Sequence, residues 1–219
     1  MTGAASSGQA PLFGMCHLAP AIGRLRLHAG LMGAGKSALA IQVAFHRRQA
    51  GRPGLLFTSL DRGHSGQLSS RLGIAAKAQE FDPETDFVEV VGESLPPRGF
   101  VIVDEAQFLT ETQVEELALL VDEHAIDVDC FGLLTAFDSR TFPGSRRLVE
   151  LADEILPLVE VLCWCGQPGR VNARIEEGKP VRSGDQVAFG DLSGDVGATY
   201  RVLCRRHWRE GDPGPEYRG

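Results

Sequence analysis

A glycine-rich stretch near the N-terminus contains the residue types that bind phosphate groups. It reads Gly30-Leu-Met-Gly-Ala-Gly-Lys-Ser37, which is a complete Walker A pattern. Glycines allow backbone N–H groups to turn toward phosphate oxygens, and the start of the following helix adds partial positive charge. Lys36 is expected to reach the β- and γ-phosphates of ATP, and the Ser37 hydroxyl to bind Mg²⁺. The predicted phosphate-binding residues are Gly30, Met32, Gly33, Ala34, Gly35, Lys36 and Ser37.

A second stretch supplies acidic residues for the same chemistry. Phe100-Val-Ile-Val-Asp104 is a continuous apolar run that ends in an acid and is followed by Glu105. Such a run is typical of a strand buried on both faces of a parallel sheet. Asp104 is predicted to hold Mg²⁺ together with Ser37, and Glu105 to act as the catalytic base on a water or on a substrate hydroxyl. The two motifs alone leave both an ATPase and a kinase open.

Three cysteines and a histidine in the C-terminal third have the chemistry of a metal site. Cys163 and Cys165 are separated by one residue rather than the usual two, and Cys204 and His207 follow later in the chain. Side chains two apart on a strand point the same way, so both thiolates can reach one zinc ion, with Zn–S bonds of about 2.3 Å. A Cys₃His set leaves no open position, which predicts a structural zinc ion. The alternative is that Cys163 or the whole set binds no metal.

The elements that must position these groups alternate between strands and helices. Strands are predicted at 23–29, 55–59, 87–91, 100–104 and 128–134, and helices at 38–48, 112–124 and 145–155, with a loop-like segment and room for a short helix at 61–80. This alternation predicts an α/β fold of the P-loop NTPase type, with a mostly parallel sheet and helices on both faces. After residue 158, short apolar runs and Gly/Pro turns predict a small β-rich zinc-binding lobe.

Length and composition fit one domain with a small appendage. The chain has 219 residues, of which 43% are hydrophobic and 23% are charged. We predict a flexible leader at 1–20, a P-loop α/β domain at 21–158, a zinc lobe at 159–208 and a disordered tail at 209–219.

Charge and residue usage exclude several partners and compartments. The net charge of −7 disfavours sequence-independent binding of nucleic acid, which requires a basic surface. No apolar run approaches the roughly 18 residues that cross a bilayer, and the leader lacks the pattern of a secretory signal, so no membrane partner is expected. Five cysteines, an odd number, argue against a disulfide framework and fit a reducing cytoplasm.

Beyond these motifs, the sequence resembles the thymidine kinase family that includes the cytosolic vertebrate enzyme and many bacterial enzymes. Its phosphate loop is similar to the family's Gly-Pro-Met-Phe-Ser-Gly-Lys-Ser/Thr, and Asp104-Glu-Ala-Gln-Phe-Leu109 resembles the family's Asp-Glu-x-Gln-Phe-Phe. Gly132-Leu-Leu-Thr-Ala-Phe137 and Leu151-Ala-Asp-Glu-Ile155 resemble Gly-Leu-Asp-x-x-Phe and Leu-Ala-Asp-x-Val. The ending Tyr200-x-x-x-Cys204-Arg-x-His207 is also similar. Together the matches run in the family's order from residue 22 to residue 208.

The resemblance implies transfer of the γ-phosphoryl group of ATP to the 5′-hydroxyl of thymidine, for deoxynucleoside salvage. Deoxyuridine is a possible second substrate. The resemblance also implies that Glu105 is the base. It implies a lasso loop, here 176–199, that is anchored by the zinc lobe and closes over the nucleoside. It also implies a cytoplasmic homotetramer and feedback inhibition by thymidine triphosphate. The residues that match the family's nucleoside pocket are Met32, Phe108, Leu133, Phe137, Phe142, Asn172 and Tyr200.

Three features depart from the family's pattern. Leu134 and Ala136 stand where the family has acids, so either a structural carboxylate is lost or this loop is arranged differently. Asp61 precedes an arginine directly, where the family has Asp-x-Arg, and is assigned to the Mg²⁺ shell on that partial match. Asn172 replaces a threonine that borders the thymine methyl group. The preference between thymidine and deoxyuridine therefore stays open, since one methyl group discriminates by only about 1–3 kcal/mol.

The alternative from another class is a P-loop ATPase or regulatory module whose zinc lobe binds a partner protein. Such a protein would keep both phosphate motifs and Glu105 but would not need an aromatic pocket or a lasso. The aromatic residues at matching positions favour the kinase.

Overall fold

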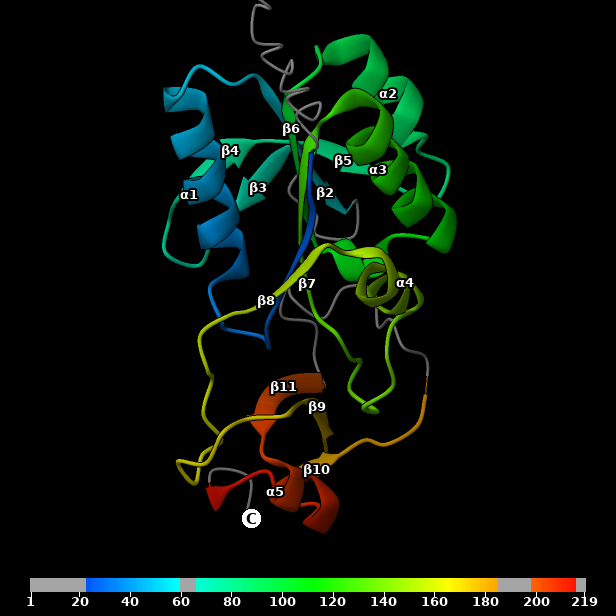
Figure 1. The fold of residues 1–219 in the computed structure, drawn as a ribbon. Helices are drawn as coiled ribbons and strands as arrows, with labels where there is room; N and C mark the ends of the chain where they lie inside the picture. The colour runs from blue at the N-terminus through cyan, green and yellow to red at the C-terminus, as the bar shows by residue number, and fades with distance from the viewer. Residues whose placement is uncertain (1–22, 60–65, 185–197, 216–219) are drawn as a thin grey trace, which may run out of the picture.

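Six parallel strands form the central sheet of the computed structural model, which describes residues 23–59, 66–184 and 198–215 (Figure 1). The strand order is β5-β2-β6-β7-β1-β8, and each neighbouring pair is parallel. The strands are β1 (Leu25–Ala29), β2 (Gly54–Ser59), β5 (Gln79–Phe81), β6 (Phe100–Asp104), β7 (Asp127–Gly132) and β8 (Glu154–Pro157). Because parallel strands end at the same edge of a sheet, the segments that follow β1, β6 and β7 come together there.

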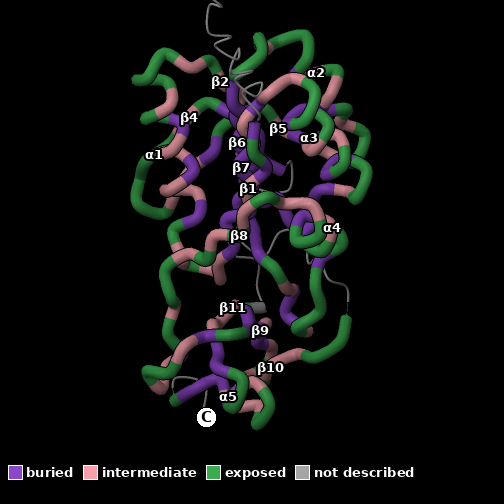
Figure 2. Tube along the Cα trace, viewed as in Figure 1, coloured by how far each residue is buried: buried purple, intermediate pink, exposed green. Residues whose placement is uncertain are grey.

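Helices cover both faces of this sheet, as the alternation predicts. Figure 1 shows helices on both sides of the sheet, and Figure 2 shows that buried residues follow the strands between them. The first face carries α1 (Lys36–Gln49) with β3 (Gln67–Ser69) and β4 (Ala75–Lys77), and the second carries α2 (Phe87–Ser94), α3 (Glu111–His124) and α4 (Pro143–Leu151). The predicted α/β class is confirmed.

A buried ion pair between α1 and the central sheet holds α1 in place. Arg47 of α1 pairs with the Asp129 carboxylate of β7 at 2.5 Å. The His28 ring of β1 places Nε2 2.9 Å from the same carboxylate, and the carboxylate belongs to a buried residue. Buried charges are tolerated when they are paired in this way. The contact fixes the helix that begins at the phosphate loop.

The predicted strand at 87–91 is wrong, because the structure forms helix α2 there. The Asp86 side chain caps the helix by accepting a hydrogen bond from the Glu89 N–H at 2.9 Å. Phe87 and Val91, which are four residues apart, are both fully buried. The N–H of Phe87 donates to Glu116 Oε2 of α3 at 2.9 Å. Five residues are too few to separate a period of two from a period of 3.6, so the cap and the packing against α3 decide.

Two further segments differ from expectation. The helix predicted at 145–155 ends at Leu151, after which the backbone turns extended at Ala152 and residues 154–157 form β8 beside β1. In the segment 61–80, the described part forms β3, β4 and the start of β5 instead of a short helix. Both changes add strands at positions where neighbouring backbone offers hydrogen-bond partners.

A small antiparallel sheet forms the C-terminal lobe, as predicted. Its strand order is β10 (Lys179–Pro180), β9 (Val171–Glu176) and β11 (Ala198–Leu203), and the short helix α5 (Arg205–Glu210) follows. The expected disordered tail from 209 differs from the structure, since α5 continues to Glu210 and Pro213 and Gly214 are buried. The predicted leader at 1–20 and the residues 216–219 lie outside the described residues. Within the described ranges, no helix is long and apolar enough to cross a membrane.

Candidate active site

The phosphate loop connects β1 to α1 and has the backbone shape that anion binding requires. Gly33 and Gly35 have φ values of 82° and 79°, a conformation that favours glycine. The Ala34 N–H donates to the Leu31 carbonyl at 3.1 Å and tightens the turn. Lys36 is buried, and its Nζ donates to the carbonyls of Gly30 and Leu31 at 3.2 and 3.0 Å. The loop therefore combines a tight turn, a helix start and an ammonium group at one place.

Two oxygen atoms lie side by side where the two phosphate motifs meet. The Ser37 hydroxyl donates to Asp104 Oδ2 at 2.7 Å, although β7 separates the strands from which the two motifs come. Hydroxyl and carboxylate oxygens, completed by substrate phosphates and water, are the ligands that Mg²⁺ uses in such sites. The pair fits that ion. Asp61, the other predicted magnesium ligand, lies outside the described residues.

Glu105 has an unusual backbone conformation directly after the buried strand β6. Its φ and ψ are 55° and 37°, in the left-handed region, and its side chain is buried. Non-glycine residues in this region cost about 1–3 kcal/mol and are concentrated at functional sites. The Gln107 amide Nε2 donates to Glu105 Oε2 at 2.5 Å. The turn after β6 thus places a buried, hydrogen-bonded carboxylate next to Asp104.

An apolar cluster packs against Phe108 of this turn and contains four of the predicted nucleoside-binding residues. Leu133 and Phe142 are buried together with Ala136, and Met32 and Phe108 pack against them. The rings of Phe108 and Phe142 meet edge to face, with their centroids 5.9 Å apart. Aromatic rings in this arrangement are a stable framework for a planar ligand. Met32 comes from the phosphate loop, so the cluster connects the candidate phosphate site to the candidate nucleoside pocket.

Phe137 and Tyr200, two other predicted pocket residues, lie toward the lobe. The Arg174 guanidinium of β9 is 5.1 Å above the centre of the Phe137 ring, and Tyr200 pairs with Arg174 across β9 and β11. Gly184 also approaches Phe137, since a Cβ built there would lie 4.0 Å from its ring. The predicted lasso leaves β9 at Glu176 and returns at β11, but 185–197 lie outside the described residues.

The lobe contacts the phosphate loop directly. Asn172 of β9 is buried, and its Oδ1 accepts a hydrogen bond from the Met32 N–H at 2.8 Å. A Cβ at Gly169 would lie 3.0 Å from Leu31 Cδ1, so the lobe backbone packs on the neighbouring loop residue as well. The side chain expected to border the thymine methyl group therefore also holds the phosphate loop in place.

The loop after β7 is arranged without the acids of the family's pattern. Backbone bonds close it, with Thr135 bridged to Thr141 and the Phe142 N–H donating to the Leu134 carbonyl at 3.2 Å. Leu134 is exposed, whereas Ala136 is buried in the apolar cluster. Both readings of these departures, a lost structural carboxylate and a different arrangement of the loop, stay open.

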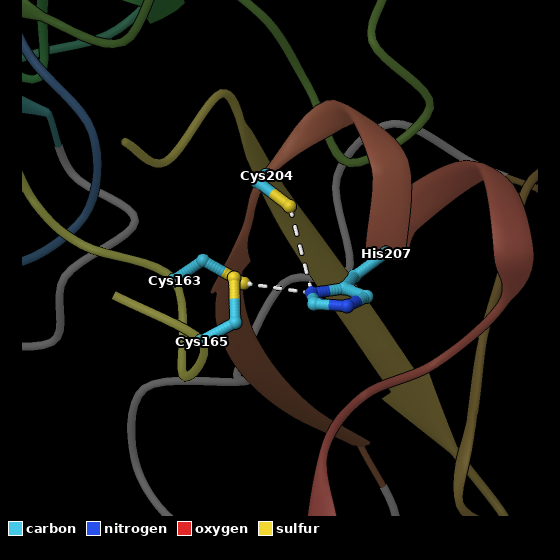
Figure 3. A group of neighbouring side chains, drawn as sticks. All are labelled: Cys163, Cys165, Cys204 and His207. Carbon is cyan, nitrogen blue, oxygen red and sulfur yellow. Dashed lines mark hydrogen bonds between the residues drawn. The ribbon is translucent and has the colours of Figure 1, made fainter. Parts of the chain in front are cut away.

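The three cysteines and the histidine converge in the lobe (Figure 3). The ligand atoms of Cys163, Cys165, Cys204 and His207 all lie within 4.8 Å of one another. The sulfur atoms of Cys163 and Cys204 are each 3.5 Å from His207 Nδ1. The cluster thus forms despite the short Cys-x-Cys spacing, and its soft sulfur and imidazole ligands fit zinc.

The thiols of this cluster differ in how readily they lose a proton. Burial raises the pKa of the Cys163 thiol. Burial also acts to raise the pKa of Cys204, but hydrogen bonds from the His207 backbone N–H and from neighbouring thiols outweigh it, so the pKa of Cys204 is lowered. A thiolate is the form that binds a metal ion. Of Cys163 and Cys204, Cys204 is therefore the one better prepared to provide a thiolate.

Sequence reasoning missed two buried residues that support the site. Gln107 connects Glu105 to the loop after β7, because its Oε1 accepts the Leu133 N–H at 3.0 Å. Ser145 of α4 donates to the Leu133 carbonyl at 2.6 Å. The only sequence signal was the position of Gln107 inside the stretch after Asp104, and nothing distinguished Ser145 from other serines.

Known proteins resemble this chain across both the sheet and the lobe. A family model described as thymidine kinase matches residues 23–208. The thymidine kinase of Cutibacterium acnes is 44% identical over 194 residues, which cover 87% of this chain and 90% of the relative. Those of Streptomyces avermitilis and Streptomyces coelicolor are 45% and 46% identical over 188 residues, which cover 83% of this chain and 86% of each relative. The matched range includes the phosphate motifs, Glu105 and the Cys/His cluster.

Proposed function

Because this chain belongs to the thymidine kinase family, we infer that it phosphorylates thymidine, transferring the γ-phosphoryl group of ATP to the 5′-hydroxyl. The observation that carries this inference is the position of Glu105. It follows Asp104, which is bonded to Ser37 of the phosphate loop, and it precedes Phe108 of the apolar cluster by three residues. A base placed between a phosphate site and an apolar pocket suits transfer to a nucleoside hydroxyl better than hydrolysis by water.

We propose the following roles for the residues around the transferred group. Lys36 binds the β- and γ-phosphates and offsets their charge, and the backbone N–H groups of the phosphate loop orient them. Ser37 and Asp104 would hold Mg²⁺, which supplies further neutralisation of phosphate charge. Glu105 accepts the proton of the 5′-hydroxyl. At the same time the hydroxyl oxygen bonds to the γ-phosphorus, and the bond between that phosphorus and the oxygen that leaves with ADP breaks. In a loose transition state, alignment of that hydroxyl contributes most.

The nucleoside pocket is proposed to follow the apolar cluster. Met32, Phe108, Leu133 and Phe142 would enclose the thymine ring, and Phe137 and Tyr200 would close the side toward the lobe and the lasso. Asn172 would act through Met32, whose N–H it binds. Close packing at Met32 can then favour or exclude the thymine methyl group, an effect of about 1–3 kcal/mol.

A panel of nucleosides tests the proposed activity. With ATP and Mg²⁺, purified protein is expected to convert thymidine to thymidine monophosphate and deoxycytidine not measurably. The rate with deoxyuridine measures the effect of the thymine methyl group, about 10- to 100-fold in either direction. Product is measured by chromatography and ATP consumption in parallel. ATP hydrolysis that does not depend on any nucleoside, with no nucleotide product, would instead support the ATPase or regulatory module.

The Cys/His cluster is proposed to bind one structural zinc ion, held by Cys163, Cys165, Cys204 and His207. Four protein ligands leave no position for a substrate, so the ion would stabilise the lobe by cross-linking two segments far apart in the chain. This would anchor β9 and β11, between which the lasso runs.

Metal analysis of variants tests this site. Wild-type protein purified without chelator is expected to contain about one zinc ion per chain, and Cys204→Ser well below half of that. The matched control is Cys130→Ala. Cys130 is buried in β7, away from the cluster, and burial raises the pKa of its thiol, so it stays protonated. The control should keep its zinc, and a wild-type protein with almost none would contradict the site.

Other expectations remain predictions. The resemblance predicts a homotetramer, inhibition by thymidine triphosphate and a cytoplasmic location, and zinc-binding thiolates suit a reducing compartment. The division into an α/β domain at 21–158 and a zinc lobe at 159–208 is likewise a proposal.

A further inference from the structure

We propose that Gln107 is a positioning residue, which orients the Glu105 carboxylate and connects it to the wall of the nucleoside pocket at Leu133. This inference rests on the proposed function, since it assigns a partner to the proposed base. The residue itself need not touch either substrate.

The two hydrogen bonds of the Gln107 side chain allow only one orientation of its amide. Nε2 lies 2.5 Å from Glu105 Oε2, and Oε1 lies 3.0 Å from the Leu133 backbone nitrogen. An ionised carboxylate can only accept a hydrogen bond, and a backbone N–H can only donate one. The NH₂ group must therefore face Glu105 and the carbonyl oxygen must face Leu133. Gln107 is 3% exposed, so water does not readily replace either partner.

The Leu133 backbone is a fixed point for this link. Its N–H is held by Gln107, and its carbonyl accepts a hydrogen bond from the buried Ser145 hydroxyl at 2.6 Å. Gly132, the preceding residue, makes the approach possible, since a Cβ there would lie 3.0 Å from Gln107 Oε1 and 3.1 Å from its backbone nitrogen. The Leu133 side chain belongs to the apolar cluster. One amide thus joins the base to the pocket wall.

This link gives the Glu105 carboxylate a defined direction. One carboxylate oxygen is occupied by Gln107, which prevents free rotation of the group about its last bond. Glu105 itself has left-handed backbone angles and precedes the short 3₁₀ helix Ala106–Phe108, so the backbone of this turn and the Gln107 amide together set the direction of the carboxylate. Misplacement of a catalytic group by about 1 Å can reduce the rate about 10²-fold. The amide therefore supports turnover by holding the base in place.

Three substitutions at Gln107 separate positioning from simple packing. Gln107→Met keeps the length and removes both hydrogen bonds, while Gln107→Glu keeps an acceptor for Leu133 but places a second carboxyl group against Glu105, so that the pair shares a proton and the base is less able to accept one. Both are expected to lower kcat for thymidine about 10- to 100-fold, with an unchanged KM for ATP. Near wild-type kcat in Gln107→Met would overturn the proposal, because the base would then be held in place without either hydrogen bond. Gln107→Asn, too short to bridge both partners, is expected to behave like Gln107→Met.

Gln113 provides the matched control. It is equally buried and also bridges segments, since its Nε2 donates to the carbonyls of Asp82 and Thr85 at 2.7 and 2.9 Å. Gln113→Met should lower the melting temperature at least as much as Gln107→Met but leave kcat unchanged. A loss of kcat that simply follows the loss of melting temperature in both variants would contradict positioning.

A double-mutant cycle with Glu105→Gln completes the test. If Gln107 acts through Glu105, adding Gln107→Met to Glu105→Gln should reduce kcat by less than twofold further, whereas independent effects would multiply. Multiplying effects would overturn the proposal. Full turnover by Glu105→Gln alone would refute the proposed base. That failure can be told apart from a failure of the Gln107 proposal, because Glu105→Gln is measured by itself, without any change at Gln107.

Discussion

Glu105→Gln is expected to lower kcat for thymidine phosphorylation by about 10²- to 10⁴-fold, the range that a general base contributes. The amide has nearly the same shape as the carboxylate but cannot take up the proton of the 5′-hydroxyl. Its oxygen can still accept the hydrogen bond from Gln107 Nε2, so the turn after β6 should keep its conformation. ATP binding should stay close to wild type, because Lys36 and the Ser37–Asp104 pair are unchanged. Steady-state kinetics and ATP titration measure both quantities.

Glu116→Gln is the control for this substitution. Glu116 is a half-buried carboxylate on α3 that accepts the Phe87 N–H at 2.9 Å, and burial raises its pKa. It lies away from the phosphate loop, so the same chemical change there should leave kcat unaltered. Turnover by Glu105→Gln within a few-fold of this control would refute the assignment of the base.

Lys36→Met is expected to reduce kcat/KM for ATP by about 10²- to 10³-fold, as removal of one preorganised charged or donor group from a transition-state site typically does. Methionine has a similar length and suits a buried position, but it carries no charge and donates no hydrogen bond. The Lys36 Nζ donates to the Gly30 and Leu31 carbonyls, which places the ammonium group within the phosphate loop. Binding of ATP, measured by titration, should weaken together with turnover.

Lys77→Met removes the same charge from an exposed position on β4 and should change neither quantity by more than about twofold, because surface charges at a distance are screened. Equal effects of the two substitutions would show that net charge, and not a contact with phosphate, explains the loss. A Lys36→Met enzyme with wild-type affinity for ATP would contradict the phosphate assignment.

The predictable features of this protein are those encoded by contiguous residues. The phosphate loop requires glycines and Lys-Ser at fixed spacing, and the apolar run before Asp104 requires burial on both faces of a sheet. Both conditions are local, so the parallel sheet, the start of α1 and the position of Glu105 after β6 agree with expectation. The cysteine cluster was also predictable, since few residue types bind zinc.

Other features follow from contacts between distant segments. Residues 87–91 fit a strand or a helix equally well, and the cap at Asp86 together with burial against α3 selects the helix. The helix predicted at 145–155 stops at Leu151 because the edge of β1 offers backbone partners to residues 154–157. Local propensity is a weak guide where two elements compete for the same residues.

By itself, the sequence determined which residues we propose for the chemistry of this protein: Lys36, Ser37, Asp104 and Glu105 at the phosphate site, and the cysteines with His207 in the lobe. Only the tertiary structure decided which side chains hold them in place. Gln107 meets Leu133 across 26 positions, and Asn172 meets the Met32 backbone across 140. The physical reason is that a hydrogen bond forms with whatever group packing brings within about 3 Å, and packing depends on the whole chain, whereas a motif depends only on its own residues.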